Sequence, residues 1–502
     1  RGSSSKQVQM YVDGLLVNDS QFGGFDLNQI PTEQIQSIEI SKNQALGSGS
    51  TPIGGVIRIN TYNPSQDQLK LSLALGSFNH QEVNVVYNKA FAANNLALGG
   101  SYLTTDNNYD YLVPQSFTNS NQSSTEPLSN NQFEKKNVYL NNQLFLEHHK
   151  IRITAQYNQQ QKALPNYQNN TPENSASLAS DTWRVGYRHS IDSELTWLDN
   201  LEFELYQEDK SEQYLDILAD IKRLDAHYDT TKTHAALNTS LVFDSQYGDV
   251  AVSPSLEWNK QQFASLSFDR NGPIVCNGIS RCDVVAQQVQ VLIGSRLQWQ
   301  QNDGPFSAYS FVTQLQEKNE NSPVNQADAP AFYNKHTHHT QELGVVYQGQ
   351  YVKTELIASK GVRTPTLFEL FGDRGLFKGS SELLPEQAKT LSVGTVYHNK
   401  FAEMDYSINA TVYQQQSDNA IVAIFNSSGV GAYKNVSDAK LLGFEFETKV
   451  AVTPKLNFTL QSNIIDSQTR SDIKSFNDKK LPGIYHQQYS LSAHYQINPQ
   501  WK

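Results

Sequence analysis

The sequence predicts an all-β membrane barrel in which a small N-terminal domain fills the lumen of a large antiparallel sheet. Residues 8–62 combine short β-branched runs with Gly-rich turns, whereas from residue 64 onward apolar and polar residues alternate in strand after strand. Short turns and long polar loops join these strands in alternation, as expected of a barrel with two unlike rims. A small mixed domain followed by hundreds of residues of amphipathic strand indicates a plug inside a barrel.

The N-terminal stretch predicts short strands separated by tight turns. Two runs, VQMYVDG and QSIEISKN, flank a polar, Gly-rich middle, and a second Gly-rich run leads into VIRINT. Isoleucines recur at every second position in both later runs, which is the period of a strand. We therefore assign residues 1–63 to part of a plug domain and residues 64–502 to the barrel.

Clean alternation begins with four leucines at positions 69, 71, 73 and 75, and short turns then join one strand to the next. A long polar loop is expected at residues 106–132 and a second at about 159–180. The same pattern continues to the end of the chain. It contains roughly 19 strands, each about as long as a tilted membrane strand needs to be.

Composition agrees with a barrel but does not prove one. The 502 residues are 38% hydrophobic, the mean hydropathy is -0.54, and no apolar run approaches the roughly 18 residues of a membrane helix. A membrane barrel has the same profile, because only alternate residues face lipid. The 25 tyrosines and 23 phenylalanines suit aromatic girdles at two membrane interfaces, and the net charge of -11 argues against a nucleic-acid partner.

Both cysteines, Cys276 and Cys282, fall in one short stretch, VCNGISRC. The intervening residues, which include Asn277 and Gly278, can close a small disulfide loop in an oxidising compartment. The alternative is a pair of free thiols. Without a nearby histidine the two cysteines make a poor zinc site.

Several motifs in the right order resemble the second half of the plug domain of TonB-dependent outer-membrane receptors. They are VDG followed by ND, then DLNQIP, IQSIEI and IGGVIRINT. Near the end, YKNVSDAKLLGFEFETKV and LPGIYHQQYSLSAHYQI resemble a late strand of that family and the strand after it. Asn43 stands where the family usually has glycine, Leu46 where an aromatic often precedes the next glycine, and SGSTPIGG replaces an alanine-containing turn, which leaves the subfamily open.

This resemblance implies a 22-stranded transmembrane barrel, truncated here by about three strands, around the C-terminal half of a plug. The opening RGSSS resembles the run that precedes the VDG strand in the family, although an expression-tag scar is the alternative. On the first interpretation the secretion signal, the first half of the plug and the TonB-contacting segment precede this sequence.

The implied function is TonB-dependent uptake of a scarce metal chelate, such as a ferric siderophore or cobalamin, across the outer membrane of a Gram-negative bacterium. The implied partners are the TonB protein, the chelate and outer-membrane lipid, around a monomer that holds no cofactor. The sequence does not identify the chelate.

The first candidate site is the apical plug loop DSQFGGF. Glycines there permit positive φ and close approach to a ligand, and the glutamine and phenylalanines offer hydrogen bonding and stacking. In similar receptors this loop projects toward the extracellular cavity. The alternative is that the two glycines only make a turn. The candidate residues are Asp19, Ser20, Gln21, Phe22, Gly23, Gly24 and Phe25.

The second candidate site is the segment RTPTLFELFGDRGLFKGSSELL at residues 363–384, which resembles the extracellular loop after the RxPxxxELF-like strand end of the family. Its aromatic and charged side chains could fold over a bound chelate, or they could pack a self-contained Ω-loop. The candidate residues are Phe368, Phe371, Asp373, Arg374 and Phe377.

A histidine cluster, YNKHTHH, is the strongest indication of a metal site. His336 and His338 are two residues apart and share a face of an extended segment, while His339 points the other way. Imidazole pairs suit Zn, Cu or Ni. No third ligand is evident, so a solvated loop or strand end is the alternative.

No enzyme motif is present: the sequence lacks GxSxG, HExxH, a P-loop and a GxGxxG after a strand. Glu445 and Glu447 share a strand face, which fits a polar row facing the lumen better than acid–base catalysis. Three rival classes remain open: a zinc or other free-metal receptor of the same fold, a passive porin, and a soluble β-rich enzyme or adhesin. A porin would lack the plug motifs, and a soluble protein would need no aromatic rows facing lipid.

Overall fold

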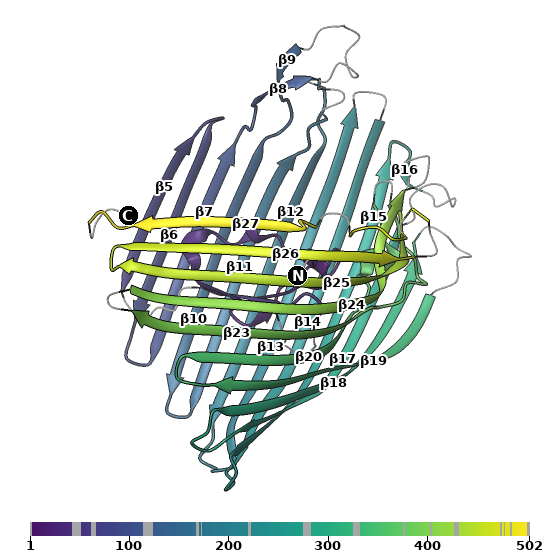
Figure 1. Cartoon of the computed structure of the whole chain (residues 1–502). Coiled ribbons are helices and arrows are strands. Elements are labelled where there is room, and N and C mark those ends of the chain that lie inside the picture. Colours follow the sequence, from purple (N-terminus) through teal and green to yellow (C-terminus); the bar gives the residue numbers. More distant parts are fainter. Residues whose placement is uncertain are drawn as a thin grey trace.

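In the computed structural model the chain forms a wide β-barrel around a small inner sheet (Figure 1). The structure describes residues 3–42, 52–61, 67–113, 124–166, 170–171, 173–218, 222–274, 283–324, 332–374, 377–401, 404–425, 431–471, 474–475, 477–481 and 484–498. The predicted disulfide between Cys276 and Cys282 lies outside these residues, as do Asn43 and Leu46.

The inner sheet has the strand order β2-β1-β4-β3, in which β1 and β4 are parallel and the other pairs are antiparallel. A tight turn at Asp13 and Gly14, both with positive φ, joins β1 to β2. Buried apolar residues from the sheet and its loops form a small core of its own. The elements are η1 (Ser5–Gln7), β1 (Gln9–Val12), β2 (Leu15–Leu16), η2 (Leu27–Gln29), η3 (Thr32–Gln34), β3 (Ile35–Ser41) and β4 (Val56–Thr61).

The wall is a closed barrel of antiparallel strand pairs in which β7 pairs with β10, β15 with β17 and β20 with β23, and the short β22 runs parallel to β25. A separate hairpin, β8 (Asp110–Val113) with β9 (Ser124–Pro127), stands at one end. The strands of the wall are β5 (Gln68–Gly76), β6 (His80–Ala90), β7 (Asn94–Thr105), β10 (Phe133–Leu146), β11 (His149–Ala163), β12 (Ser177–Asp192), β13 (Leu198–Leu218), β14 (Lys222–Phe243), β15 (Asp249–Asp269), β16 (Gly272–Pro273), β17 (Val284–Gln300), β18 (Phe306–Pro323), β19 (Phe332–Gln348), β20 (Val352–Arg363), β21 (Asp373–Arg374), β22 (Phe377–Lys378), β23 (Glu386–Phe401), β24 (Met404–Phe425), β25 (Gly431–Thr453), β26 (Leu456–Arg470) and β27 (Gln487–Tyr495).

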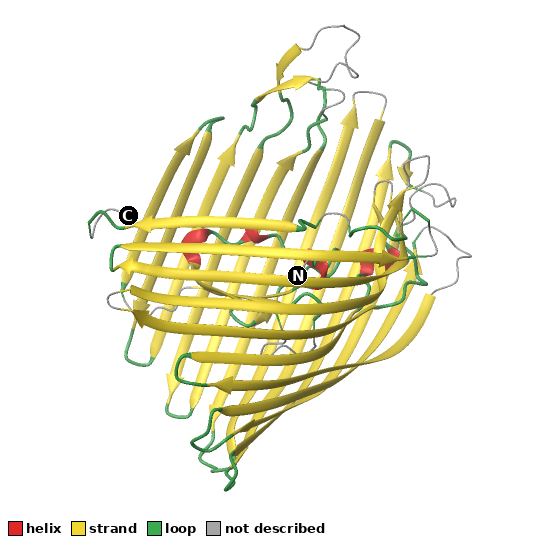
Figure 2. Cartoon of the chain, viewed as in Figure 1, coloured by secondary structure: helices red, strands yellow, loops and turns green. Residues whose placement is uncertain are grey.

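The predicted all-β barrel is confirmed: strands dominate the molecule, and its helices are single short turns (Figure 2). Eighteen of the described wall strands have nine residues or more, close to the number expected from the sequence. The total of 22 and the domain boundary at residue 63 remain predictions. No helix in the described part of the chain has the length and apolar character needed to cross a membrane.

Burial alternates along the wall strands as the sequence predicts. On β12, Trp183 and Val185 point outward and are about half exposed, whereas Thr182 and Arg184 point into the lumen and are buried. The outward face therefore carries the apolar residues and the lumen face the polar ones, which is the pattern of a membrane barrel.

The two rims differ as predicted. One rim, the short-turn rim, carries connections of two to five residues such as 147–148, 301–305 and 349–351. The opposite one, the long-loop rim, carries the β8–β9 hairpin and the segment between β20 and β23. The second long loop is shorter than expected, at residues 164–176, because polar residues continue the alternation of β11 and β12 beyond the apolar band.

Aromatic side chains line the outside of the barrel near the short-turn rim. Phe306 and Tyr347 face each other with ring centroids 5.3 Å apart, and the rings of Tyr397 and Tyr406 lie 5.9 Å apart. Aromatic rings favour the level of lipid headgroups. These rows fit one of the two girdles predicted from the sequence.

Glycines in the wall make room for tyrosine rings that lie over them. Gly99 on β7 is paired with Tyr139 on β10, and a Cβ on Gly99 would overlap the Tyr139 ring. The same pairing recurs at Gly344 with Tyr309 and at Gly443 with Tyr413.

We expect Gly99→Ala to destabilise the barrel by about 1–3 kcal/mol, because the buried Tyr139 ring has to move for the added methyl group. Unfolding in denaturant, followed by heat-modifiable gel migration, measures the loss. Gly100→Ala is the matched control, since its Cβ would meet only the Asn137 carbonyl oxygen at 3.6 Å. Equal stability of the two variants would contradict this explanation.

Candidate functional site at the long-loop rim

The inner-sheet segment at residues 19–25, called here the inner loop, is a compact turn. Asp19 Oδ1 accepts hydrogen bonds from the backbone N–H groups of Gln21 and Phe22, both at 2.8 Å. Gly23 has φ +78°, and a Cβ there would come within 2.7 Å of the Thr366 side chain. The glycine therefore serves the turn and also the close approach of a second segment.

The inner loop is fastened to the wall through Asp19. Its Oδ2 lies 2.8 Å from Nζ of Lys210 on β13, and Lys210 also lies 3.2 Å from Glu212. Burial acts to raise the pKa of the Asp19 carboxyl, but the Lys210 ammonium and the two N–H donors hold that pKa below its usual range.

The depressed pKa of Asp19 predicts a pH dependence. The ionised Asp19 carboxylate stabilises the folded inner loop at neutral pH. This stabilisation is lost only as the pH falls through the pKa of Asp19 in the folded protein, which lies below the ordinary value of about 4. In hydrogen exchange, we expect protection of the Gln21 and Phe22 amides to persist from pH 7 to pH 5. Asp19→Asn should lose about 1.5–3 kcal/mol of that protection at every pH in this range. Protection in the wild type that falls between pH 7 and pH 5 would contradict the assignment.

A second segment, residues 364–385, enters the lumen from the end of β20 and is called here the rim segment. It begins with the helix α1 (Leu367–Phe371), which is held by a capping box. Thr366 Oγ1 accepts from the backbone N–H of Glu369 at 3.2 Å, and Glu369 Oε2 accepts from the backbone N–H of Thr366 at 3.0 Å. A five-residue helix with no reciprocal cap would have little stability of its own.

The apolar side chains of α1 are buried against the wall. They share one hydrophobic cluster with lumen-facing residues of β14, β15 and β17, so the short helix lies inside the barrel. This cluster consists of Ala226, Tyr228, Phe263, Val284, Ala286, Leu367, Leu370, Phe371 and Leu383. Phe368 is also buried. The apolar side chains of this segment thus pack against the wall and not within a self-contained loop, and contact of the segment with a ligand remains a prediction.

The inner loop and the rim segment meet. The backbone N–H of Phe368 donates to the Gln21 carbonyl oxygen at 3.3 Å, and the Phe22 and Phe368 rings lie 5.0 Å apart. Two segments that the sequence singled out separately, nearly 350 residues apart, therefore form one closed apex. Gln21 is fully buried, and neither atom of its side-chain amide has a hydrogen-bond partner among the described residues.

An ion-pair cluster beside this apex ties three parts of the chain together. Arg363 donates through Nε to Glu386 at 2.7 Å and through Nη1 to Glu369 at 2.8 Å. Lys6 of the inner sheet lies 2.9 Å from the other oxygen of Glu369, and Gln7 donates to Glu386 at 2.9 Å. Burial acts to raise the pKa of Glu369, but Arg363 and Lys6 together lower it. The sequence analysis missed this cluster, and the T-x-x-E spacing of the capping box was the available signal.

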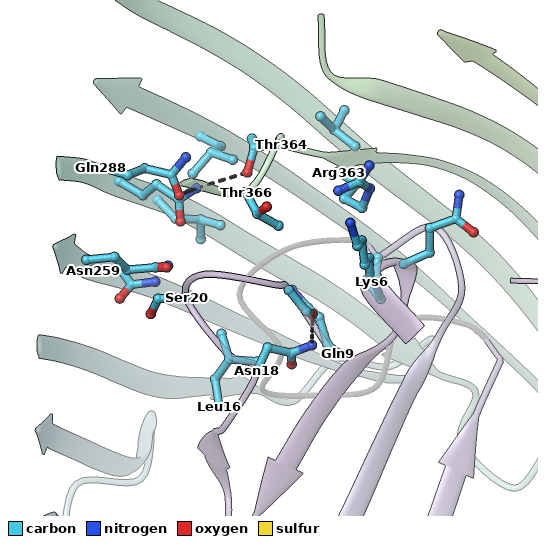
Figure 3. Close-up of a pocket in the computed structure, with 18 of the residues that line it drawn as sticks. Lys6, Gln9, Leu16, Asn18, Ser20, Asn259, Gln288, Arg363, Thr364 and Thr366 are labelled. Atoms are coloured by element: carbon cyan, nitrogen blue, oxygen red, sulfur yellow. Dashed lines mark hydrogen bonds between the residues drawn. The ribbon is translucent and has the colours of Figure 1, made fainter. Parts of the chain in front are cut away.

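A cavity of about 170 Å³ lies between the inner sheet and the wall next to this cluster. Figure 3 shows Lys6 and Asn18 on the inner-sheet side, with Gln288, Arg363 and Thr364 opposite. Ligand pockets usually measure 300–1,000 Å³. The cavity as it stands is therefore too small for a chelate, although its amides and charges suit polar groups.

The other predicted site residues lie apart from the apex. His336 and His338 face the lumen from β19 with their rings 6.0 Å apart, and no group of three His, Cys, Asp or Glu suited to a metal occurs among the described residues. Asp373, Arg374 and Phe377 form the short strands β21 and β22, and their side chains lie outside the described part.

The fold and this site define a transmembrane β-barrel with a folded sheet in its lumen and a segment closing the apex. A family model described as TonB dependent receptor-like, beta-barrel, matches residues 14–502. The chain belongs to this family. The resemblance drawn from the N-terminal motifs is thereby confirmed.

Curated relatives align over limited segments. The vitamin B12 transporter BtuB of Vibrio cholerae serotype O1 is 39% identical over 104 residues, which are 20% of this chain and 17% of that protein. The probable TonB-dependent siderophore receptor PiuA of Acinetobacter baumannii is 25% identical over 127 residues, or 23% of this chain and 16% of that protein. The aligned parts thus span less than a fifth of either relative.

Solved structures resemble the whole chain. The copper transporter OprC superposes with a TM-score of 0.75 at 12% identity, covering 98% of this chain and 75% of that one. The siderophore receptor PiuA superposes with a TM-score of 0.73 at 15% identity, covering 99% and 78%. Similarity at this level of identity shows the fold alone.

Proposed function

We propose that the protein carries out TonB-dependent active transport of a scarce metal chelate, a ferric siderophore or cobalamin, across the outer membrane of a Gram-negative bacterium. The observation that carries this proposal is the inner sheet fastened inside the barrel beneath a closed apex. A barrel of this width with an empty lumen would conduct solutes passively. A filled lumen blocks passive conduction, so transport through it needs an energy input and a specific cargo.

The contacts between the inner sheet and the wall suit displacement under force. They are mostly polar: Gln34 donates to Asn137 at 2.9 Å, and Arg184 donates to Gln29 at 2.7 Å. Lys232 donates to the Leu16 carbonyl oxygen at 2.6 Å. Exchange of such bonds with water costs about 0.5–1.5 kcal/mol each, whereas separation of two apolar faces would cost far more. Such an interface seals the lumen yet yields to a pull from TonB.

The relatives favour a chelate over other cargo. A vitamin B12 transporter and a probable siderophore receptor are among the proteins with sequence similarity to this chain, and both names refer to metal chelates. On this proposal cargo binds at the long-loop rim, and the inner loop and rim segment then separate. The candidate contacts of the inner loop are Asp19, Ser20, Gln21, Phe22, Gly23, Gly24 and Phe25.

Uptake by cells that carry the complete gene tests the proposal. Ferric siderophores, cobalamin and zinc are offered in turn, with and without an uncoupler of the proton-motive force. We expect saturable uptake of one chelate that the uncoupler reduces to background. Uptake that is linear in concentration and insensitive to the uncoupler would establish a passive pore and overturn the proposal.

A free-metal receptor is the second candidate, favoured by the stacked rings of His336 and His338 in the lumen. Calorimetric titration with Zn²⁺ separates the two functions. If the cargo is a chelate, we expect His336→Ala/His338→Ala to take up the chelate within about twofold of the wild type. We also expect the variant to bind Zn²⁺ as the wild type does. The matched control is His149→Ala/His189→Ala, a second histidine pair whose ring nitrogens lie 3.0 Å apart near the short-turn rim. Zinc uptake lost only in the first variant would favour the metal receptor.

A further inference from the structure

A row of lysines crosses the outside of the barrel near the long-loop rim. Lys360 on β20 lies directly opposite Lys389 on β23, Lys389 lies opposite Gln416 on β24, and Gln416 lies opposite Lys440 on β25. These side chains alternate with lumen-facing neighbours that are buried, such as Ala388 and Ala439, so the row points away from the lumen. Four adjacent strands thus carry three cations in one transverse line.

The lysines of this row have no ion-pair partner among the described residues, and Asp418, two residues along β24 from Gln416, instead accepts a hydrogen bond from the Gln416 amide at 3.3 Å. Neither Lys360, Lys389 nor Lys440 has an ion pair in the described part of the chain, and like charges directly opposite each other destabilise a sheet. Two other outward lysines at a similar height do have partners. Lys136 lies 2.7 Å from Glu134, and Lys318 pairs with Glu320. We therefore expect an anion from outside the chain to bind this row.

A groove of about 380 Å³ lies along part of this row. One row of its lining carries the two lysines with Gln341 and Gln416, and the next row toward the short-turn rim carries Leu343, Ala358, Leu391 and Gln414. The lining includes Gln341, Leu343, Ala358, Lys360, Lys389, Leu391, Gln414 and Gln416. A ligand that fits this surface has an anionic end and a hydrocarbon end.

The position of the groove along the strands shows which level of the lipid bilayer it faces. Lys360 is three residues from the long-loop end of β20, and Lys389 is three residues from the corresponding end of β23. Leu343 and Leu391, each about half exposed, point outward on the side of the short-turn rim. The lysines therefore lie where the apolar band ends, at the headgroup level of the leaflet that faces the long loops.

We propose that the lysine row and its groove bind the phosphate groups of an acylated lipid of the outer leaflet. The ammonium groups of Lys360, Lys389 and Lys440 neutralise the phosphates, and the amide of Gln341, directly opposite Lys360, donates a further hydrogen bond. An acyl chain lies along Leu343 and Leu391. This site requires the barrel to lie in a membrane whose long-loop leaflet carries phosphorylated lipid, but it does not depend on which cargo is transported.

Lipid retention by the detergent-solubilised complete protein tests the proposal. Native mass spectrometry measures binding of bis-phosphorylated lipid A, of dephosphorylated lipid A and of inorganic phosphate. For the wild type we expect at least tenfold tighter binding of the bis-phosphorylated lipid than of the dephosphorylated one, weakening with added salt. Lys360→Gln/Lys389→Gln/Lys440→Gln should remove this preference, with folding checked by heat-modifiable gel migration.

The matched control is Lys136→Gln/Lys318→Gln, which removes two outward lysines that already have glutamate partners. We expect this control to bind lipid as the wild type does. Equal binding of phosphorylated and dephosphorylated lipid by the wild type would overturn the proposal even if the triple variant does not fold. Displacement of the lipid by millimolar inorganic phosphate would show a site for free anions and would also overturn it.

Discussion

Arg363→Ala is expected to detach the rim segment from the inner sheet and to cost roughly 3–5 kcal/mol of local stability. The guanidinium lies between Glu369 and Glu386, and both carboxylates are buried. Its removal leaves two buried negative charges with Lys6 as their one cation among the described residues, because their other partners, Gln7 and two backbone N–H groups, are uncharged. Hydrogen exchange of the amides of α1 measures the opening free energy directly.

The control for Arg363 is Lys136→Ala, which breaks an ion pair of similar length in an exposed position. We expect it to change local stability by less than about 1 kcal/mol, because solvent screens the pair. A loss below about 1 kcal/mol in Arg363→Ala would show that the apolar packing of α1, and not the ion-pair cluster, holds the apex closed.

A covalent bond between the inner loop and α1 is expected to stop transport. Phe22→Cys/Phe368→Cys places two thiols on backbones that the 3.3 Å hydrogen bond from the Phe368 N–H to the Gln21 carbonyl oxygen holds close together. The background carries Cys276→Ser and Cys282→Ser. If cargo requires the two segments to separate, oxidation removes the competent state and uptake falls by about tenfold or more. Reduction should restore uptake in the same cells.

Each single-cysteine variant controls for the loss of an aromatic ring and should respond to neither oxidant nor reductant. Gel migration with and without reductant establishes how much of the protein is cross-linked. Full uptake by fully cross-linked protein would mean that cargo passes without parting the inner loop from α1, and the closed-apex mechanism would be wrong.

Much of the architecture follows from local sequence patterns. Alternation is a property of neighbouring residues, so Trp183 and Val185 could be assigned to one face before any partner strand was known. Glu445 and Glu447 were correctly placed on one face by the same argument, and both line a lumen cavity. The paired histidines of β19 do share a face.

The candidate site was only partly predictable. The sequence singled out the inner loop and the segment around Phe368, but it left open whether the aromatic side chains of that segment contact a ligand or pack among themselves. In the structure Phe368 and Phe371 are buried, because β14, β15 and β17 present an apolar surface inside an otherwise polar lumen. That surface comes from residues such as Tyr228 and Phe263, whose outward or inward direction depends on the register of distant strands.

The sequence by itself determined the alternation of faces, the asymmetry of the rims and the family, because each depends on residues close together in the chain. Only the tertiary structure decided which distant charges meet. Lys6 and Glu369 are 363 residues apart, and Lys360 meets Lys389 across a strand pair interrupted by the rim segment. Such pairs depend on strand register and on the curvature that closes the barrel, and no periodicity within one strand encodes either.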